Sequence, residues 1–148
     1  MAKDKLPVLK RLAEDVERVR GHELRQLREE RRTQEAQAQA LEDMLEDYRE
    51  SHRETVSVQP EQLAIFQRFY SRVRDTLVSH GDHVETLRDA EQAGERAWQQ
   101  AYRKNQAISR LQEKRIEEAR RESLRKERRT GVFRRWSMLN TNEQERGD

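Results

Sequence analysis

A long row of residues that repeats at alternating intervals of three and four positions restricts most strongly how this chain can fold. The row occupies the second half of the sequence and consists of Leu63, Phe66, Tyr70, Val73, Leu77, His80, Val84, Leu87, Glu91, Gly94, Trp98, Ala101, Asn105, Ile108, Gln112, Arg115 and Ala119. A repeat averaging 3.5 residues keeps one stripe of a helix facing a partner helix, and it is typical of a left-handed coiled coil. The row becomes polar at Gln112 and Arg115, so we expect helical structure to extend beyond the paired part.

Composition agrees with this reading. Only 32% of the 148 residues are hydrophobic and 41% are charged, so the chain cannot bury a globular core of ordinary size. Glycine and proline are scarce, at 5 and 2 residues, which favours long helices over a disordered polar segment. The absence of cysteine fits a reducing compartment. We find no signal peptide and no stretch long enough to span a membrane, so we expect a cytoplasmic protein.

The first half of the chain carries the same spacing in two phases. The first set is Leu9, Leu12, Val16 and Val19, and the second is Leu24, Leu27, Arg31, Gln34, Ala38, Leu41, Leu45 and Tyr48. The phase changes near Gly21, as it would at an inserted stutter. We therefore expect the first helix to be locally unwound or loosely packed at this glycine.

The two halves are separated by a segment that breaks the helical pattern, Thr55-Val56-Ser57-Val58-Gln59-Pro60-Glu61. Pro60 and Glu61 suit the first turn of a new helix, with Ser57 or Gln59 near its cap position. A short connection makes neighbouring helices antiparallel. The sequence therefore predicts an all-α fold, a long two-helix antiparallel coiled-coil hairpin with an overhanging C-terminal helix end. In this register residue numbers of paired positions sum to about 115, which places Leu9 near Asn105 and Tyr48 near Phe66 or Gln67.

We expect a single coiled-coil domain over residues 1–148, with helix one at about 4–54, the turn at 55–60 and helix two at about 60–129. Nothing is left to pair beyond about Arg110. Gly131 is expected to end the second helix, because glycine commonly follows a helix C-terminus. The remainder, 131–148, is then a flexible tail whose Phe133, Trp136, Met138 and Leu139 order on a partner.

Charge is unevenly distributed along the chain. Leu41 to Gln100 carries 13 acidic and 7 basic residues, whereas Arg103 to Arg135 carries 13 basic and 5 acidic. Clustered arginines can bind nucleic acid, but this basic segment lacks interleaved aromatic residues within the helix and a recognisable reading module. A solvated helix face or a protein-docking surface is the preferred interpretation.

No catalytic motif stands out, and a two-helix hairpin offers no enclosed pocket, so we expect no enzyme activity and no cofactor. The cluster His80-Gly81-Asp82-His83 could bind a metal, but solvated or seam histidines are the better interpretation. His80 and Asn105 are polar seam residues that would fix the register. Met44, Ile65 and Phe69 lie just off the seam, either as a broadened stripe or as an exposed apolar patch kept for a partner.

In the order and spacing of several segments the sequence resembles the flagellar export protein FliJ family, over roughly Leu6 to Arg129. The resemblance is carried by Leu9, Leu12 and Ala13, by Leu41 through Tyr48-Arg49, by Phe66-Gln67-Arg68-Phe69, by Trp98-Gln99-Gln100-Ala101-Tyr102, and by Glu117-Glu118-Ala119-Arg120-Arg121.

The resemblance implies a soluble stalk component of the flagellar type III protein export apparatus, serving motility and chemotaxis. Its paired ends would enter the ring of the export ATPase FliI, and the opposite part would meet the export-gate protein FlhA. The resemblance also implies an escort role for empty export chaperones, no nucleic-acid partner, and a position at the cytoplasmic face of the inner membrane at the flagellar base, peripheral and without direct membrane insertion.

The resemblance also implies two sets of contact residues. The export-gate set is Gln37, Leu41, Met44, Tyr48, Phe69, Val73, Thr76 and His80. Met44 stands where the family usually has an aromatic residue, and Thr76 where it has alanine. The ATPase set is Leu9, Leu12, Val16, Arg110, Arg120 and Arg121.

Three other functions remain open at this point. An equivalent stalk protein of a virulence injectisome would share the fold and differ in its substrates. A basic helical protein that binds nucleic acid would show a steep salt dependence. A structural coiled-coil scaffold would form a defined dimer.

Overall fold

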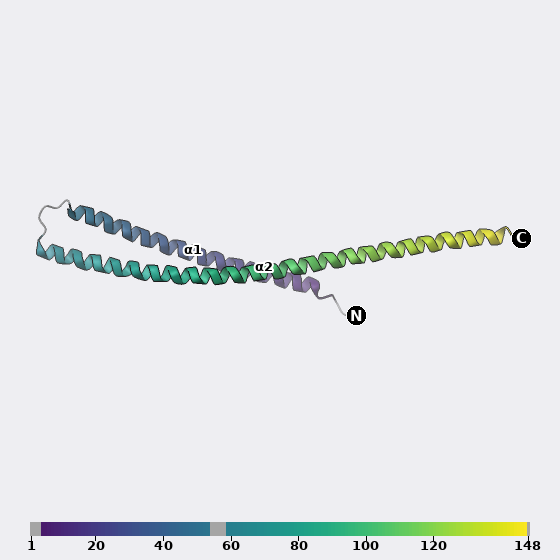
Figure 1. Ribbon diagram of the computed structural model, residues 1–148, viewed down its shortest axis with the longest axis horizontal. Coiled ribbons are helices and arrows are strands. Elements are labelled where there is room, and N and C mark those ends of the chain that lie inside the picture. The colour runs from purple at the N-terminus through teal and green to yellow at the C-terminus, as the bar shows by residue number, and fades with distance from the viewer. Residues whose placement is uncertain (1–3, 54–58, 148) are drawn as a thin grey trace. The chain divides into compact units, whose positions relative to one another are not determined.

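The structure is a computed structural model that describes residues 4–53 and 59–147. It contains two helices, α1 (Leu6–Arg53, 48 residues) and α2 (Pro60–Glu145, 86 residues), and no strand within the described ranges (Figure 1). The chain divides into two compact units, Met1–Ala13 with Arg103–Asp148, and Glu14–Tyr102. Within each unit a part of α1 packs antiparallel on a part of α2, so the predicted all-α helical hairpin is confirmed. Residues 55–58 of the expected turn lie outside the described residues.

Both helices begin with groups that satisfy the first free backbone N–H donors. The carboxylate of Asp4 accepts a hydrogen bond from the backbone N–H of Leu6 at 3.1 Å. Pro60 starts α2, where its missing N–H costs nothing, and the carbonyl of Gln59 accepts from the N–H of Leu63 at 3.1 Å. The expected start at Pro60 is therefore found, and Ser57, the other cap candidate, lies outside the described residues.

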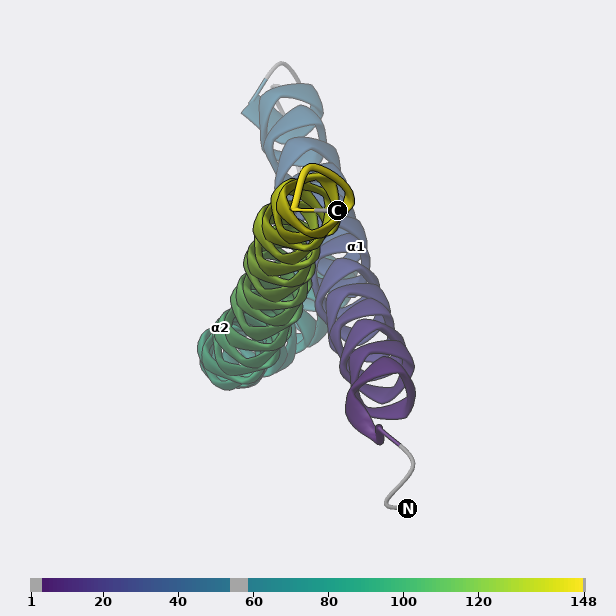
Figure 2. The same cartoon turned by 90° about the vertical axis from the view of Figure 1, so that its right-hand side faces the viewer.

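The predicted seam of α2 is confirmed from Phe66 to Ala101 in the unit Glu14–Tyr102, whereas Leu63, the first residue of the predicted row, is 45% exposed. Val73, Leu87 and Ala101 are buried. The seam positions between and beside them are half-buried, and these are Phe66, Tyr70, Leu77, His80, Val84, Glu91, Gly94 and Trp98. Figure 2 shows the two helices of the hairpin from the end of α2. The core of this unit is thus a single narrow row of side chains from each helix.

Two glycines in this seam face large side chains of the other helix. A methyl group added at Gly21 would lie 3.4 Å from Cδ1 of Trp98, and one added at Gly94 would lie 3.5 Å from the Cδ1 atoms of Leu24 and Leu27. Interdigitation of large with small residues fills the space between packed elements without voids. Gly21 therefore belongs to the seam, and α1 continues through it as a helix.

The expected seam over the first four turns of α1 is wrong. Leu9, Leu12, Val16 and Val19 are exposed, with exposed fractions of 41–58%. The buried and half-buried positions are instead Leu6, Lys10, Ala13, Glu17, Gly21 and Leu24. The second phase of the repeat thus extends to the start of α1, and no stutter is needed. The physical reason is that the residue opposite Trp98 must be small, since even a methyl group at Gly21 would already touch the indole ring.

Polar pairs complete the seam of the unit Glu14–Tyr102. Arg31 Nε donates to a carboxylate oxygen of Glu91 at 2.5 Å, and Nδ1 of His80 lies 2.7 Å from Oε1 of Gln34. Arg88 donates to Glu35 at 3.0 Å. Such pairs form fully only when the helices hold one axial position, so they favour a single register.

The unit formed by Met1–Ala13 and Arg103–Asp148 has its own cross-helix contacts. Nζ of Lys10 donates to Oδ1 of Asn105 at 2.5 Å and also to the hydroxyl of Ser109. Arg115 donates to Asp4 at 2.8 Å. Contacts with the N-terminal segment, including Asp4 just before α1, therefore extend to Arg115, a little beyond the expected limit near Arg110.

The second helix does not end at Gly131 but continues to Glu145. Gly131 has no positive φ, so it lacks the left-handed conformation of a glycine C-cap. A single glycine inside a helix costs only about 1 kcal/mol relative to alanine, and no proline follows it. Residues 132–145 are therefore helical rather than an irregular tail.

In the described part of the chain, neither helix holds a segment apolar enough over a sufficient length to cross a membrane.

Replacing Gly21 by leucine should lower the free energy of unfolding by about 1 to 3 kcal/mol, because the new side chain must displace Trp98. Gly81 is the matched control, since it is also helical but has no atom within 4 Å of an added methyl group. Gly81→Leu should raise stability by about 0.5 to 1 kcal/mol through helix propensity. Urea unfolding followed by circular dichroism measures both, and equal stability of the two variants would contradict the packing at Gly21.

Acid should weaken the hairpin partly through Glu35. Hydrogen bonds from Arg88 and then Arg31 hold the pKa of this carboxylate below its ordinary value. The folded-state pKa is therefore lower than the unfolded one, so the contribution to stability is present above the unfolded pKa and lost as pH falls through the folded pKa. The fall of the melting temperature on acidification should be smaller in Glu35→Gln than in the parent chain. In a Glu42→Gln control this fall should equal that of the parent chain. An identical acid response in all three proteins would rule out this role.

Candidate functional site

The predicted export-gate residues form two matched stripes in the unit Glu14–Tyr102. Gln37, Leu41, Met44 and Tyr48 follow one side of α1 at helical spacing, and Phe69, Val73, Thr76 and His80 follow one side of α2. The ring of Tyr48 lies 4.9 Å from that of Phe69, so the two stripes meet at this pair. Because the helices are antiparallel, Met44 then lies at about the same level along the pair as Val73, and Leu41 at about the level of Thr76.

These eight residues combine a buried row with an exposed edge. Val73 is buried, and Leu41 and His80 are half-buried in the seam. Gln37, Met44, Tyr48 and Thr76 are exposed, with Met44 at 44%. The hydroxyl of Thr76 donates to the carbonyl of Arg72 in its own helix, so this side chain is not committed to the other helix. The exposed edge is the part that a partner can reach.

The three off-seam apolar residues do not share one environment. Met44 and Ile65 are exposed, as expected, with Ile65 at 62%. Phe69 is half-buried, because its ring packs on Tyr48. Phe69 therefore supports the hairpin as well as contributing to its surface.

An aromatic cluster closes the described end of the hairpin, next to the connection between the helices. The ring of His52 stacks on that of Phe66 at 4.5 Å, and Phe66 also stacks on Tyr48 at 5.1 Å. Nε2 of His52 is buried and has no hydrogen-bond partner within the described part of the chain. At this end of the hairpin, stacked aromatic rings fill the space between the two helices, whereas smaller aliphatic side chains fill it further along the seam.

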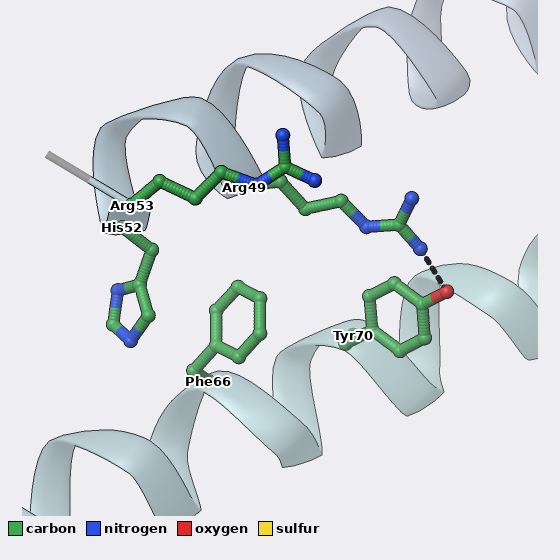
Figure 3. A pocket seen from close by; sticks show the side chains of 5 residues that line it. All are labelled: Arg49, His52, Arg53, Phe66 and Tyr70. Carbon is green, nitrogen blue, oxygen red and sulfur yellow. Dashed lines mark hydrogen bonds between the residues drawn. The ribbon is translucent and has the colours of Figure 1, made fainter.

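Arg49 caps the same cluster. Its guanidinium lies 4.7 Å from the centre of the Tyr70 ring and donates to the Tyr70 hydroxyl (Figure 3). Arg49, His52, Arg53, Phe66 and Tyr70 line a shallow pocket. The sequence pattern singled out Arg49 only as part of the family resemblance, and it did not single out His52 or Arg53 at all. The spacing of four residues between Tyr48 and His52, one helical turn, could have indicated that these two rings lie together.

The two histidines of the possible metal cluster face different partners. His80 lies against Gln34, and Nε2 of His83 lies 3.4 Å from a carboxylate oxygen of Glu30. Within the described ranges, no group of three or more His, Cys, Asp or Glu side chains is arranged to hold a metal ion.

The predicted ATPase residues are exposed. Leu9 and Leu12 belong to the unit that contains Arg103–Asp148, together with Arg110, Arg120 and Arg121, whereas Val16 belongs to the unit Glu14–Tyr102. Leu12 has an exposed fraction of 58%. Arg121 forms an ion pair with Glu117 of its own helix at 2.8 Å, and so offers a mixed-charge surface.

A family model described as Flagellar FliJ protein matches residues 2–130. The chain belongs to the FliJ family. It is therefore a flagellar, export-associated protein, and the matched family is a flagellar one rather than that of an injectisome. No curated protein and no solved structure matches the chain. Residues 131–148 of this FliJ-family protein lie beyond the matched region.

Phe69 and Met44 should differ in their effect on folding. Phe69→Ala should lower the free energy of unfolding by about 1 to 2 kcal/mol, because it removes a half-buried ring and its contact with Tyr48. Met44→Ala should change it by less than about 0.5 kcal/mol, because the side chain is exposed. Chemical unfolding of the two single variants measures the difference. A large loss in Met44→Ala would make this residue part of the core and remove it from the exposed edge.

Proposed function

We propose that this FliJ-family chain is a stalk component that links the export ATPase FliI to the export-gate protein FlhA in the flagellar type III export apparatus. It acts through protein contacts and not through catalysis. Membership of the family supports the flagellar part of this proposal. The observation that carries the rest is that apolar side chains of both predicted contact sets are exposed.

The gate contact is assigned to the exposed edge of Gln37, Met44, Tyr48 and Thr76. Met44 and Tyr48 supply apolar area, and the neighbouring Phe69 holds Tyr48 in place. A few well-placed apolar and aromatic side chains usually carry most of the energy of a protein interface. This edge therefore has the composition of a small binding surface, next to the buried Val73 and the half-buried Leu41 of the same stripes.

The ATPase contact is assigned to Leu9, Leu12 and Val16, with Arg110, Arg120 and Arg121 contributing charge. The seam does not use these apolar residues, since the inward positions of α1 are Lys10, Ala13 and Glu17. Because these apolar side chains are exposed, a partner can contact them. In the expected seam position they would have been covered by the other helix. An escort role toward empty export chaperones would use one of these same exposed surfaces.

Three arginine substitutions at exposed apolar positions separate the two contacts. Met44→Arg should weaken binding to the cytoplasmic part of FlhA by about tenfold or more and leave FliI binding unchanged, because a buried unpaired charge at an interface costs well over 1.4 kcal/mol. Leu12→Arg should do the reverse. Val78→Arg is the matched control, because Val78 is 60% exposed and lies on neither stripe. Binding is measured with purified components by titration at two salt concentrations.

The results also test the competing functions. Failure of the parent chain to bind either protein would overturn the proposal. Retention of both interactions in Met44→Arg and Leu12→Arg would overturn the assigned residues. A defined dimer in solution would favour a self-associating scaffold. Tight, strongly salt-dependent binding to nucleic acid that survives Met44→Arg would favour the nucleic-acid reading.

A further inference from the structure

The last turns of α2 carry large apolar side chains that nothing in the described chain covers. Val132, Phe133, Trp136 and Leu139 have exposed fractions of 59–68%. The rings of Phe133 and Trp136 lie 6.2 Å apart, in contact along the helix. All four residues lie beyond the region matched by the family model, so the family's known contacts do not explain them.

These side chains share one face of the helix. Val132, Trp136 and Leu139 follow one another at intervals of four and three residues, and Phe133 lies three residues before Trp136. We call these four residues the terminal apolar face. Met138 is also exposed, but it stands two residues from Trp136 and so points to the other side of the helix.

Basic residues border the terminal apolar face. Between Arg125 and Arg135 the chain carries six basic residues and one acidic residue, Glu127. Arg128 and Arg129 line a shallow depression together with Val132, Phe133 and Trp136. Arg135 follows Val132 by three residues and Arg128 by seven, so it lies on the same side of the helix as Arg128. The next acidic residue is Glu143, one turn beyond Leu139, which marks the end of the basic region.

The arginines at this face are not neutralised by the protein. Within the described part of the chain, Arg128, Arg129 and Arg135 form no ion pair, in contrast to Arg121 and Lys126, which pair with glutamates of the same helix. The surface therefore combines uncovered apolar area with uncompensated positive charge. An occupant that complements it must be apolar and negatively charged at once.

We propose that the terminal apolar face lies on the surface of a membrane that contains anionic lipids. A helix of this kind buries its apolar side chains at the boundary between headgroups and acyl chains, and its cationic residues attract anionic headgroups. Tryptophan prefers this boundary, and the long arginine stems reach from the apolar region to the phosphates. The helix rests on the lipid surface and does not cross it, in keeping with the absence of a spanning segment in the described helices.

The test is co-sedimentation of the full chain with vesicles of phosphatidylcholine alone and of phosphatidylcholine with phosphatidylglycerol. The parent chain should bind the anionic vesicles at least tenfold more tightly than the neutral ones, with binding that weakens as salt is added. Trp136→Ser should reduce binding to anionic vesicles by about tenfold or more, because it removes the largest side chain of the face. Arg128→Gln with Arg135→Gln should also reduce it, by about thirtyfold, at roughly 1 kcal/mol for each charge.

Met138→Ser is the matched control, because it removes an apolar side chain that is also largely exposed, at 72%, from the opposite side of the helix and should leave binding unchanged. Circular dichroism of every variant checks that helicity is retained. The proposal is overturned if the parent chain does not bind anionic vesicles, if it binds neutral vesicles equally well, or if Met138→Ser loses as much binding as Trp136→Ser. The contacts proposed for FliI and FlhA do not include this face, so the binding assays with those two proteins and the vesicle assay can fail independently.

Discussion

The fit between Trp98 and Gly21 is the contact on which the arrangement of the hairpin depends. A two-helix pair has one seam, so each layer of that seam must fill its space with only one or two side chains from each helix. Trp98 is the largest of these side chains, and the residue opposite must be small, because a methyl group at Gly21 would already touch the indole ring. Once Gly21 faces inward, helical geometry turns Leu24 and Ala13 inward as well. The same choice turns Leu12 and Val16 outward, and so decides which apolar residues are available to partners.

Much of this architecture could be predicted from the sequence because α2 keeps its repeat without interruption. Val73, Leu87 and Ala101 sit where the spacing placed them. The first turns of α1 could not be assigned in the same way, since Leu9, Leu12 and Val16 have the spacing of a seam although they do not form one. Periodicity identifies a stripe but does not say whether the stripe is covered. The size of Trp98 decides which stripe of α1 faces α2, and Trp98 belongs to the opposite helix.

The candidate site was predictable only in part, for a related reason. The resemblance to the FliJ family supplied the positions, and the structure shows how they differ: Met44 is exposed, Val73 is buried, and Phe69 lies between these extremes. His52 and Arg49 were not predicted, because their role depends on rings that are brought close across the hairpin. The prediction that Gly131 ends α2 was wrong because the sequence does not distinguish a glycine at a helix C-terminus from a glycine inside a helix. Only the backbone conformation distinguishes them.

The narrow seam has a consequence for how proteins of this kind diverge. A fold maintained by one row of side chains places few demands on the other faces of its helices, where most substitutions cost little stability. Residues on those faces can therefore change quickly, either neutrally or together with a changing partner, while the spacing of the seam and its large-to-small pairings are kept. Homologous chains of this kind are therefore expected to share the spacing of their seam residues more than a high sequence identity.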